Sequence, residues 1–313
     1  MQKKDYFEPV VCNLCGKDDY IVVYKDKYEK IETEQGLVNK FKSSGDETLI
    51  DQVVKCKHCG LMYINPRIKP ELIIQGYSEG TDETFISQVE GREKTFARGL
   101  KFIEKYALKN EKKPGKILDI GTAGGSFLHV AKQAGWEVHG LELNKWLCNW
   151  AKEHYDLDIQ SGTLFEQHYP DNSFDVITLW DVLEHVPDPS AILQECNRIL
   201  KEGGVIALNV PDSASWMAKI LQSKWVFLLS VHLYYFTPST MKKILEKNNF
   251  SLLAKKPHFQ ILQLGYLTMR MKAYSPFLHK VGATFVKLLH MKNLQIPYWL
   301  GQTLFVAQKK KQQ

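Results

Sequence analysis

The strongest constraint on the fold is a regular alternation of short apolar runs and amphipathic segments along the chain. The apolar runs are KILDI from residue 116, WEVHGLEL from 136, LDIQSG from 157, FDVITLW from 174, VIALNV from 205, FSLLAKK from 250 and GQTLFVAQKK from 301. Helical patterns begin at Gly125, Lys145, Pro189 and Pro238. Alternating strands and helices produce right-handed crossovers between parallel strands. The sequence therefore predicts an α/β fold with a doubly wound, mostly parallel sheet.

The stretch ILDIGTAGGSFL places a glycine-rich turn between the first expected strand and its helix. Open α/β sheets bind ligands at such turns, outside the carboxyl ends of the strands. A dinucleotide fingerprint would need glycines where this chain has Ala123 and Ser126. The pattern acid-x-Gly-x-Gly-x-Gly fits better, because Asp119, Gly121 and Gly125 match it and Ala123 is the single departure. The turn therefore favours a ligand whose amino-acid end packs against the bare backbone over a pyrophosphate.

Two short cysteine motifs, CNLCG and CKHCG, stand near the start of the chain. A two-residue gap lets both sulfurs of a motif turn onto one ion, and two motifs complete a tetrahedral structural zinc site with no open position for catalysis. The predicted ligands are Cys12, Cys15, Cys56 and Cys59. The alternatives are two disulfides, which a cytosolic chain disfavours, or a redox dithiol, which leaves the second motif unexplained. We interpret the segment between the motifs as a hairpin or loop, and Cys148 and Cys196 as core thiols.

Residues 90–256 resemble the class I S-adenosylmethionine-dependent methyltransferases in several motifs that occur in the same order. In that family an acid placed like Glu142, in HGLELN, accepts hydrogen bonds from both ribose hydroxyls of the cofactor; taken alone, Glu142 would also suit a helix N-terminus. SGTLFE is similar to the loop that touches the adenine, and LKEGGVIALNVPD to the fifth-strand block. PDNSFDVITLWDVLEHVPDP is similar to the fourth-strand block, in which Trp180 and Asp181 line the pocket.

The resemblance implies a Rossmann-like, seven-stranded sheet with a small N-terminal zinc-binding lobe, and S-adenosyl-L-methionine as the cofactor. The residues implied to bind this cofactor are Asp119, Gly121, Thr122, Ala123, Gly125, Glu142, Leu143, Gly162, Thr163, Leu164, Trp180 and Asp181.

Two histidines follow the fourth and fifth strands, where a general base could act: His185 in LEHV and His232 in VHLYYFTPST. Methyl transfer is an in-line displacement, in which positioning supplies most of the rate and a base removes the proton of the nucleophile. The second stretch is similar to HLYYF(S/T)P in a subgroup that includes members with an N-terminal four-cysteine element. Members that act on nucleotide-linked sugars often have an acid where this chain has Val231. Both histidines could instead be structural: His185 could be a helix-end residue packed on the sheet, and His232 could cap the following helix or bond within the aromatic cluster.

The stretch PFLHKVGATFVKLLHM, residues 276–291, has the period of an amphipathic helix. Its apolar face is expected to hold Leu278, Val281, Phe285 and Leu288, and its polar face His279, Lys280, Thr284 and Lys287. Such a helix usually packs its apolar face on its own domain. The alternative is peripheral membrane contact through residues 276–291, because a basic amphipathic helix can lie on an anionic membrane.

Composition and charge bear on the location of the protein and on the kinds of partner it could bind. No apolar run reaches the roughly 20 residues that span a bilayer, and the N-terminal residues carry charge throughout, so we expect a soluble, cytoplasmic protein. The net charge of +6, from 41 basic and 35 acidic residues, is too weak to indicate nucleic acid. The expected divisions are a four-cysteine lobe (1–65), a helical connector (66–110), the methyltransferase core (111–256), an insertion (257–300), and the last core strand with a basic tail (301–313).

The leading hypothesis is an enzyme that transfers a methyl group to a small-molecule acceptor, which the subgroup resemblance suggests is a sugar or another intermediate of cell-surface or secondary metabolism. RNA methylation guided by the four-cysteine element is a second hypothesis, although residues 1–60 show no net basic face. A third is a cofactor-binding scaffold without catalysis. The acceptor atom and the oligomeric state do not follow from the sequence.

Overall fold

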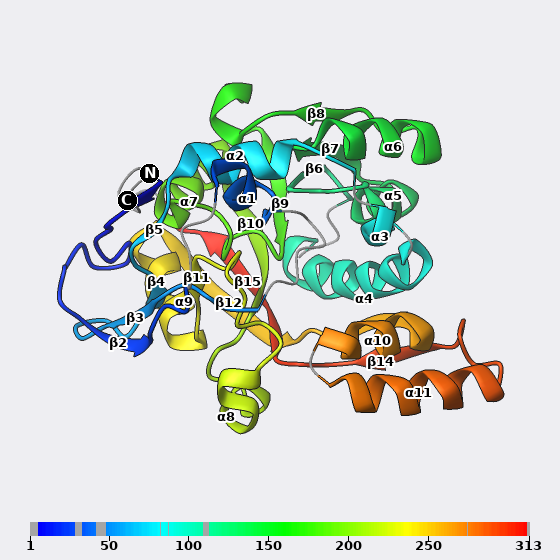
Figure 1. Cartoon of the computed structure of the whole chain (residues 1–313). Helices are drawn as coiled ribbons and strands as arrows, with labels where there is room; N and C mark the ends of the chain where they lie inside the picture. The colour runs from blue at the N-terminus through cyan, green and yellow to red at the C-terminus, as the bar shows by residue number, and fades with distance from the viewer. Residues whose placement is uncertain are drawn as a thin grey trace.

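The computed structural model describes residues 6–28, 33–41, 48–81, 83–86, 88–108, 113–273 and 275–311, and gives only the backbone for residues 84, 85, 273, 276 and 278. Residues 29–32 and 42–47, between the two cysteine motifs, and residues 109–112 of the connector lie outside the described residues. The described chain forms a central sheet between helices, an N-terminal lobe, and an insertion near the C-terminus (Figure 1). In this part of the chain, no helix combines the length and the apolar character needed to cross a membrane.

The central sheet has seven strands, which appear near the middle of Figure 1. Their bounds are β6 (Lys116–Ile120), β7 (Glu137–Glu142), β8 (Ile159–Ser161), β9 (Phe174–Trp180), β10 (Leu200–Pro211), β12 (Phe250–Pro257) and β15 (Gln302–Lys309). The spatial order is β12-β15-β10-β9-β6-β7-β8, and only β15 runs antiparallel to its neighbours in this sheet. The predicted α/β, doubly wound sheet is confirmed. The direction of strand order reverses between β6 and β9, so the crevice at their carboxyl ends is where such sheets bind ligands.

Successive residues of the central strands point to opposite faces of the sheet, and each face has its own core. The helices on the sheet are α4 (Val89–Ala107), α5 (Ser126–Gln133), α6 (Lys145–Tyr155), α7 (Pro189–Ile199) and α9 (Pro238–Lys247). Ile117 and Val176 belong to the cluster that contains apolar residues of α4, α5 and α6. Leu118 and Ile177 belong to the cluster that contains residues of α7, α9 and the N-terminal lobe. The period of two in the strands and the apolar stripes of the helices thus place these elements in layers.

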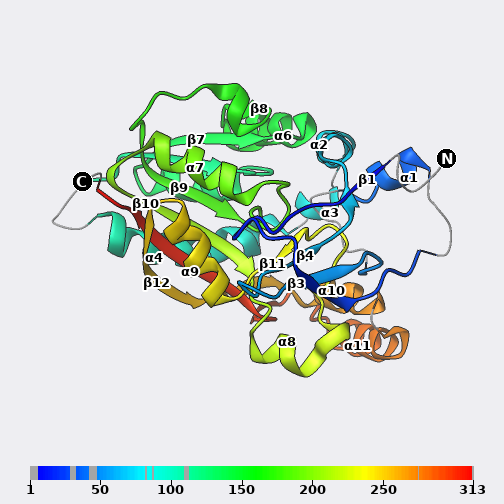
Figure 2. The ribbon, with the colours of Figure 1, turned by 90° about the vertical axis from the view of Figure 1, so that its left-hand side faces the viewer.

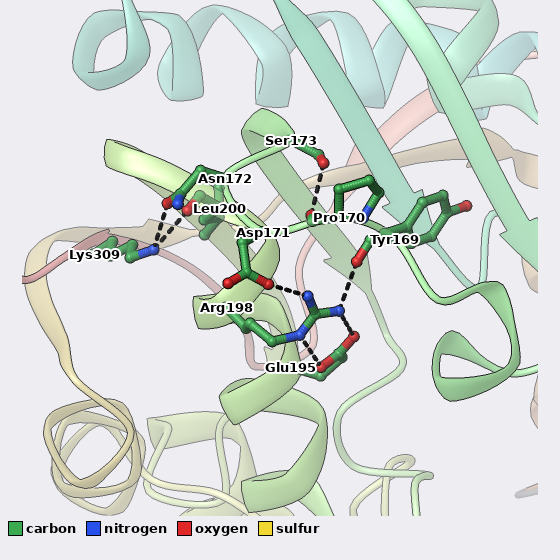
Figure 3. A network of polar contacts seen from close by, with 9 residues as sticks. All are labelled: Tyr169, Pro170, Asp171, Asn172, Ser173, Glu195, Arg198, Leu200 and Lys309. Atoms are coloured by element: carbon green, nitrogen blue, oxygen red, sulfur yellow. Dashed lines mark hydrogen bonds and ion pairs between the residues drawn. The ribbon is translucent and has the colours of Figure 1, made fainter.

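A polar network ties the end of α7 to the loop before β9 and to the last strand (Figure 3). Arg198 pairs with Asp171 and donates a hydrogen bond of 2.7 Å to the carbonyl oxygen of Tyr169. Lys309 of β15 is buried and donates a hydrogen bond of 2.7 Å to the carbonyl oxygen of Leu200. These residues lie at the amino ends of β9 and β10, away from the ligand-binding edge, so we assign the network to stability of the sheet.

The N-terminal lobe is built on a four-stranded sheet in the order β11-β4-β3-β2. The elements of this region are β1 (Phe7–Glu8), β2 (Tyr20–Tyr24), α1 (Glu34–Val38), β3 (Val53–Cys56), β4 (Met62–Ile64), β5 (Arg67–Ile68), α2 (Pro70–Ser78), α3 (Glu83–Ile86) and β11 (Tyr234–Tyr235). Strand β11 comes from the HLYYF stretch far along the chain and lies beside β4 (Figure 2). The register pairs Tyr234 with Tyr63 and Tyr235 with Met62. The lobe and the core therefore share one sheet.

The insertion begins after β12 and returns to the core at β15. Its elements are β13 (Gln260–Gln263), α10 (Leu264–Arg270), α11 (Pro276–Leu288) and β14 (Gln295–Tyr298). Strands β13 and β14 pair with each other, and β13 packs on α4, where the Ile261 amide donates to Thr95 Oγ1 at 2.8 Å. Gly91 of α4 permits this approach, because a Cβ there would lie 2.3 Å from the carbonyl oxygen of Ile261.

Helix α11 confirms the helical period but not the usual packing of its apolar face. Val281, Phe285 and Leu288 are all exposed, whereas the single buried apolar residue among the described side chains of α11 is Val286. The fourth residue expected on the apolar face, Leu278, lies outside the described side chains. The small residues Gly282 and Ala283 are half-buried, so the helix turns its small residues, not its large ones, toward the protein.

Candidate functional site

The glycine-rich turn lies between β6 and α5, at the crevice predicted by the strand order. Gly121 and Gly125 have φ angles of +68° and +77°, and Gly125 is the N-cap of α5. A Cβ at Gly121 would lie 2.6 Å from Cγ2 of Val182. Ala123, the departure from the motif, also has a positive φ of 48°, a region that a residue with a Cβ adopts at a cost of about 1 kcal/mol or more. The turn therefore keeps a backbone form that suits glycine at all three positions.

Glu142, at the end of β7, is joined directly to this turn. Its Oε2 accepts a hydrogen bond of 2.8 Å from the Ala123 amide, and its Oε1 accepts one of 2.9 Å from the Asn144 amide. Burial raises the pKa of the carboxyl, although these amides favour its ionised form. Leu143, between the two bonded residues, is half-buried. The carboxylate is thus fixed beside the turn, and each oxygen has a second lone pair with which to accept a ligand hydroxyl.

Asp119 and Thr122 lie beneath the turn. Asp119 is almost completely buried, and its Oδ1 accepts a hydrogen bond of 2.6 Å from Thr178 Oγ1 of β9. Burial raises the pKa of Asp119 to about 7. Thr122 is also buried, and its amide donates to the carbonyl oxygen of Leu141 at 3.1 Å. These bonds hold the first turn against the strands on either side of β6.

The loop after β8 adjoins the same place, because the Gly162 amide donates to the carbonyl oxygen of Glu142 at 3.0 Å. Thr163 caps a short 3-10 helix and donates from its amide and its hydroxyl to Glu166. Leu164 is buried. The sequence-predicted residues of the first three loops therefore come together at the carboxyl ends of β6, β7 and β8.

Trp180 and Asp181, after β9, have different surroundings. The Trp180 ring packs against Phe96 of α4 and Phe127 of α5, with ring centroids 5.2 Å from each, so most of it belongs to the core. Asp181 Oδ1 accepts hydrogen bonds of 2.7 Å from Asn209 and 2.8 Å from Gln302. Burial raises the pKa of Asp181 to about 6. The two residues also line a hollow of about 20 Å³, large enough for one water molecule.

Gln302 and Asn209 were not singled out from the sequence. Both are polar residues inside the apolar strands β15 and β10, and both are buried. A polar residue within such a run is a sequence signal that could have identified them, because a buried polar side chain needs a partner.

The two histidines, 47 residues apart in the sequence, lie with their ring centroids 4.6 Å apart. His232 Nδ1 lies 2.8 Å from the carbonyl oxygen of Phe227, which can only accept, so Nδ1 carries the proton and Nε2 keeps a lone pair. His185 Nδ1 lies 2.9 Å from the carbonyl oxygen of Val231 and 2.8 Å from the hydroxyl of Tyr77. Both rings are thus fixed by neighbours and neither caps a helix.

Burial sets the protonation of this group. It lowers the pKa of His232 to about 4 and that of His185 well below its ordinary value, so both rings are neutral at pH 7. Burial also raises the pKa of Glu184 well above its ordinary value. One donor atom each from Glu184, His185 and His232 lies within 4.8 Å of the other two, so this group is a second set of residues that could hold a cation.

Tyr77 of α2 contacts this histidine group and lies within the electrostatic influence of Glu142. Burial raises the pKa of its hydroxyl, and the charges of Glu184 and Glu142 both add to that effect. The backbone that follows α2 also touches the cofactor side, since Asn144 Nδ2 donates to the carbonyl oxygen of Gly80 at 3.2 Å. No sequence signal identified Tyr77, because a single tyrosine in a helical connector has no distinguishing pattern.

The four cysteines of the two motifs meet in the N-terminal lobe. Cys12 Sγ lies 3.4 Å from Cys59 Sγ, Cys15 Sγ lies 3.5 Å from Cys56 Sγ, and all four sulfurs fall within 4.8 Å of one another. None of the four forms a disulfide. Sulfurs bound at about 2.3 Å to a tetrahedral zinc ion are separated by somewhat less than 4 Å. The donor set and its spacing therefore fit one zinc ion.

Comparison with known proteins agrees with this geometry. A family model described as "Methyltransferase domain" matches residues 90–255. A ubiquinone biosynthesis O-methyltransferase of Psychrobacter arcticus is 31% identical over 144 residues, which cover 41% of this chain and 56% of that protein. The protein of the same name in Pasteurella multocida is 31% identical over 128 residues, 36% of this chain and 53% of that protein. The chain thus spans about half the length of the curated relatives it matches.

Among solved structures, an S-adenosylmethionine-dependent methyltransferase of Archaeoglobus fulgidus aligns with a TM-score of 0.48 and 20% identity, covering 73% of this chain and all of that one (100%). A putative methyltransferase of Bacillus halodurans aligns with a TM-score of 0.48 and 16% identity, covering 69% of this chain and 99% of that one. Since the matched family model covers more than half of the sequence, the chain belongs to the class I S-adenosylmethionine-dependent methyltransferases.

Proposed function

We propose that the protein transfers a methyl group from S-adenosyl-L-methionine to a small-molecule acceptor, with His232 as the general base and His185 as its neighbour. The observation that carries this proposal is the position of Tyr77. Its hydroxyl bonds to His185 and lies under the influence of the Glu142 and Glu184 charges. Tyr77 therefore relates the histidine group to the carboxylate that is expected to hold the cofactor.

The residues that would hold the cofactor are the turn of Asp119, Gly121, Thr122, Ala123 and Gly125, together with Glu142, Leu143, Gly162, Thr163, Leu164, Trp180 and Asp181. When bound, S-adenosylmethionine supplies a methyl group activated by a sulfonium. Gly121 and Gly125 have no side chain and leave the backbone of the turn open to a ligand, and Glu142 offers lone pairs to hydroxyls. Asp181, with a pKa near 6, is held by two amide side chains and contributes negative charge beside a cationic ligand.

His232 would take the proton of the acceptor on Nε2 as the bond from the acceptor to the methyl group forms and the carbon–sulfur bond breaks. Its Nδ1–H stays on the Phe227 carbonyl oxygen, which fixes the ring and stabilises the imidazolium. The lowered pKa reflects burial beside Val231, which offers no acid to pair with the ring. Positioning by the site, rather than base strength, would then supply most of the rate.

The proposed acceptor is a small molecule. Its support comes from the names of the relatives, which act in ubiquinone biosynthesis as O-methyltransferases, and from the resemblance to the subgroup with the HLYYF stretch. A sugar or an intermediate of cell-surface or secondary metabolism remains our proposal for its class.

A structural zinc ion on Cys12, Cys15, Cys56 and Cys59 is part of the proposal, supported by the spacing of the four sulfurs. We also propose the division into lobe (1–65), connector (66–110), core (111–256), insertion (257–300) and last strand with tail (301–313), and a cytoplasmic location. The proposed role of the zinc is to stabilise the lobe, in which β4 pairs with β11 and so holds the segment that carries His232.

The proposal is tested by incubating the protein with metabolite extracts and S-adenosylmethionine that carries a deuterated methyl group, and reading the labelled product by mass. With the acceptor found, His232→Ala and His232→Asn should each lower kcat by about 100-fold or more and leave the Kd of S-adenosylhomocysteine within a few fold. The Asn variant can still donate to Phe227, so it separates loss of the base from loss of the bond. His139→Ala, which changes a half-buried histidine outside the histidine group, serves as the control.

The pH profile gives a second readout. The cofactor is kept saturating, so that protonation of Asp119 and Asp181 does not limit its binding. Because the pKa of His232 is about 4, kcat/KM for the acceptor should then stay level from pH 8 to about pH 5 and fall below that as the base becomes protonated. Wild-type turnover in His232→Asn would overturn the base assignment. Binding of a nicotinamide cofactor with no binding of S-adenosylhomocysteine would overturn the whole proposal.

A further inference from the structure

The large apolar side chains of α11 form one continuous exposed face. Phe277, Val281, Phe285 and Leu288 follow the period of a helix and are 74%, 54%, 56% and 73% exposed. On the opposite side, Val286 is buried, and His279 Nδ1 lies 2.7 Å from the Thr268 carbonyl oxygen of α10. The helix is thus anchored to α10 by the side that carries His279 and Val286. Scattered exposed apolar residues are ordinary, but an aligned row of two phenylalanines, a valine and a leucine is not.

A second exposed apolar surface lies on the same side of the molecule. Trp216 and Ile220 of α8 (Trp216–Leu221) are four residues apart and are 59% and 69% exposed. Helices α8 and α11 both lie along the lower edge in Figure 1 and again in Figure 2, which is turned about the vertical axis. The Trp216 ring lies 5.7 Å from that of Trp299, at the end of the insertion. The two helices therefore lie on one side of the molecule, and each has exposed apolar side chains.

The charged residues of the two segments that carry these helices have one sign. Residues 257–300 contain no aspartate or glutamate and carry Arg270, Lys272, Lys280, Lys287 and Lys292. The segment from 213 to 245, which includes α8, also lacks acids and contains Lys219 and Lys224. Lys280 and Lys287 are exposed and lie on the flank of α11, between its apolar row and its buried side. An apolar face with a basic margin is complementary to an anionic lipid surface, where acyl chains meet phosphate headgroups.

A hollow between α10 and α11 adds to this complementarity. Its volume is about 420 Å³. Its lining includes His279, His290, Lys287 and Lys292 but no acidic residue. A second copy of the same chain would bring a like-charged margin against this one, which disfavours self-association through the face.

We propose that α11 and α8 dock the protein on the surface of an anionic phospholipid bilayer, with the apolar rows among the acyl chains and the lysines at the phosphates. This inference does not depend on methyl transfer. Helix α11 has 13 residues and is therefore roughly 20 Å long, so it would lie in the plane of the interface and not across it.

The test is flotation of the full chain with vesicles of phosphatidylcholine, with or without about 30% phosphatidylglycerol, at low salt and at about 0.5 M salt. The wild type should float with the anionic vesicles at low salt and much less at high salt or with neutral vesicles. Phe277→Ser/Leu288→Ser should lower the bound fraction about tenfold or more, because two large apolar side chains no longer leave water. Lys280→Gln/Lys287→Gln should lower it about tenfold and reduce its salt dependence.

The matched control is Ile21→Ser/Val22→Ser, which changes two apolar side chains that are 52% and 46% exposed on β2 of the lobe. It should float like the wild type. All variants should keep the melting temperature and the Kd of S-adenosylhomocysteine of the wild type, since the altered side chains are exposed. Absence of wild-type flotation on anionic vesicles at low salt would overturn the proposal. It would equally be overturned if sedimentation showed a dimer that Phe277→Ser/Leu288→Ser dissociates while flotation is unchanged.

Discussion

The two sides of the site are assembled from different parts of the chain. On the cofactor side, Glu142 bonds to Ala123, 19 residues away, and the Gly162 amide bonds to Glu142, 20 residues away. On the histidine side, His185 is bonded to Tyr77 at a distance of 108 residues. Arg67 of the lobe also donates to the hydroxyl of Tyr234 across 167 residues. The comparison teaches that the cofactor side depends on neighbouring βα units, whereas the histidine side depends on the attachment of the lobe.

The strongest test of this comparison is to remove the proposed zinc site. Cys12→Ser/Cys59→Ser should abolish metal binding and loosen the lobe, because structural zinc contributes about 10 kcal/mol or more to the folding of small zinc elements. Strand β4 then no longer holds β11, so turnover should fall by about 100-fold or more while the Kd of S-adenosylhomocysteine changes by less than about fivefold. Zinc content by elemental analysis, turnover and calorimetry measure the three quantities.

Cys148→Ser is the control for this pair, since Cys148 is a buried thiol outside the four-cysteine group. It should keep one zinc ion per chain. A wild-type protein that contains no zinc, or a double variant with normal turnover, would contradict the proposed role of the lobe.

The cofactor side of the site is tested by a substitution at Glu142. Glu142→Ala removes the carboxylate that would hold the ribose, so the Kd of S-adenosylhomocysteine should rise by about 100-fold, the equivalent of two hydrogen bonds to a charged group. Zinc content should not change. Glu137→Ala, at the exposed start of the same strand, is the matched control and should bind normally. Calorimetric titration measures both, and normal affinity in Glu142→Ala would remove this residue from the cofactor site.

The smallest effect is expected at Ala123, the departure within the turn. Ala123→Gly relieves the positive φ of 48° but adds freedom to the unfolded chain, so the free energy of unfolding should change by about 1 kcal/mol or less. The Kd of S-adenosylhomocysteine should stay within about twofold, as expected if the methyl group is tolerated beside the cofactor. Denaturant unfolding and calorimetry measure these values. A tenfold change in affinity would show that the alanine side chain shapes the pocket.

The sequence predicted most of the fold because its signals are local. The strand KILDI was placed without error as β6, FDVITLW as β9, and the helix after Lys145 begins where expected. The ends of other elements differ by a few residues, such as β10, which begins at Leu200 rather than Val205. The spacing of the cysteine motifs likewise predicted that the four sulfurs lie close together, and they do.

Other features could not be predicted because they depend on packing. The helical period of α11 predicted an apolar and a polar face, but it did not predict which face packs on the rest of the protein. In the structure the large apolar side chains are exposed. The ring of Trp180, which we expect at the pocket, also packs against Phe96 and Phe127, and no local pattern indicates these contacts. A pattern along one segment carries no information on the surface that another segment offers to it.

By itself, the sequence determined the order of strands and helices, the glycine turn with Glu142, and the two cysteine motifs. Each of these features follows from the spacing of residues within a short segment, or from a short motif whose residues would all bind the same ligand. Only the tertiary structure decided that β11 joins β4, that Tyr77 reaches His185, and that the two histidine rings lie together. Such contacts join residues far apart in the chain, so they are set by the packing of whole elements and leave no local pattern.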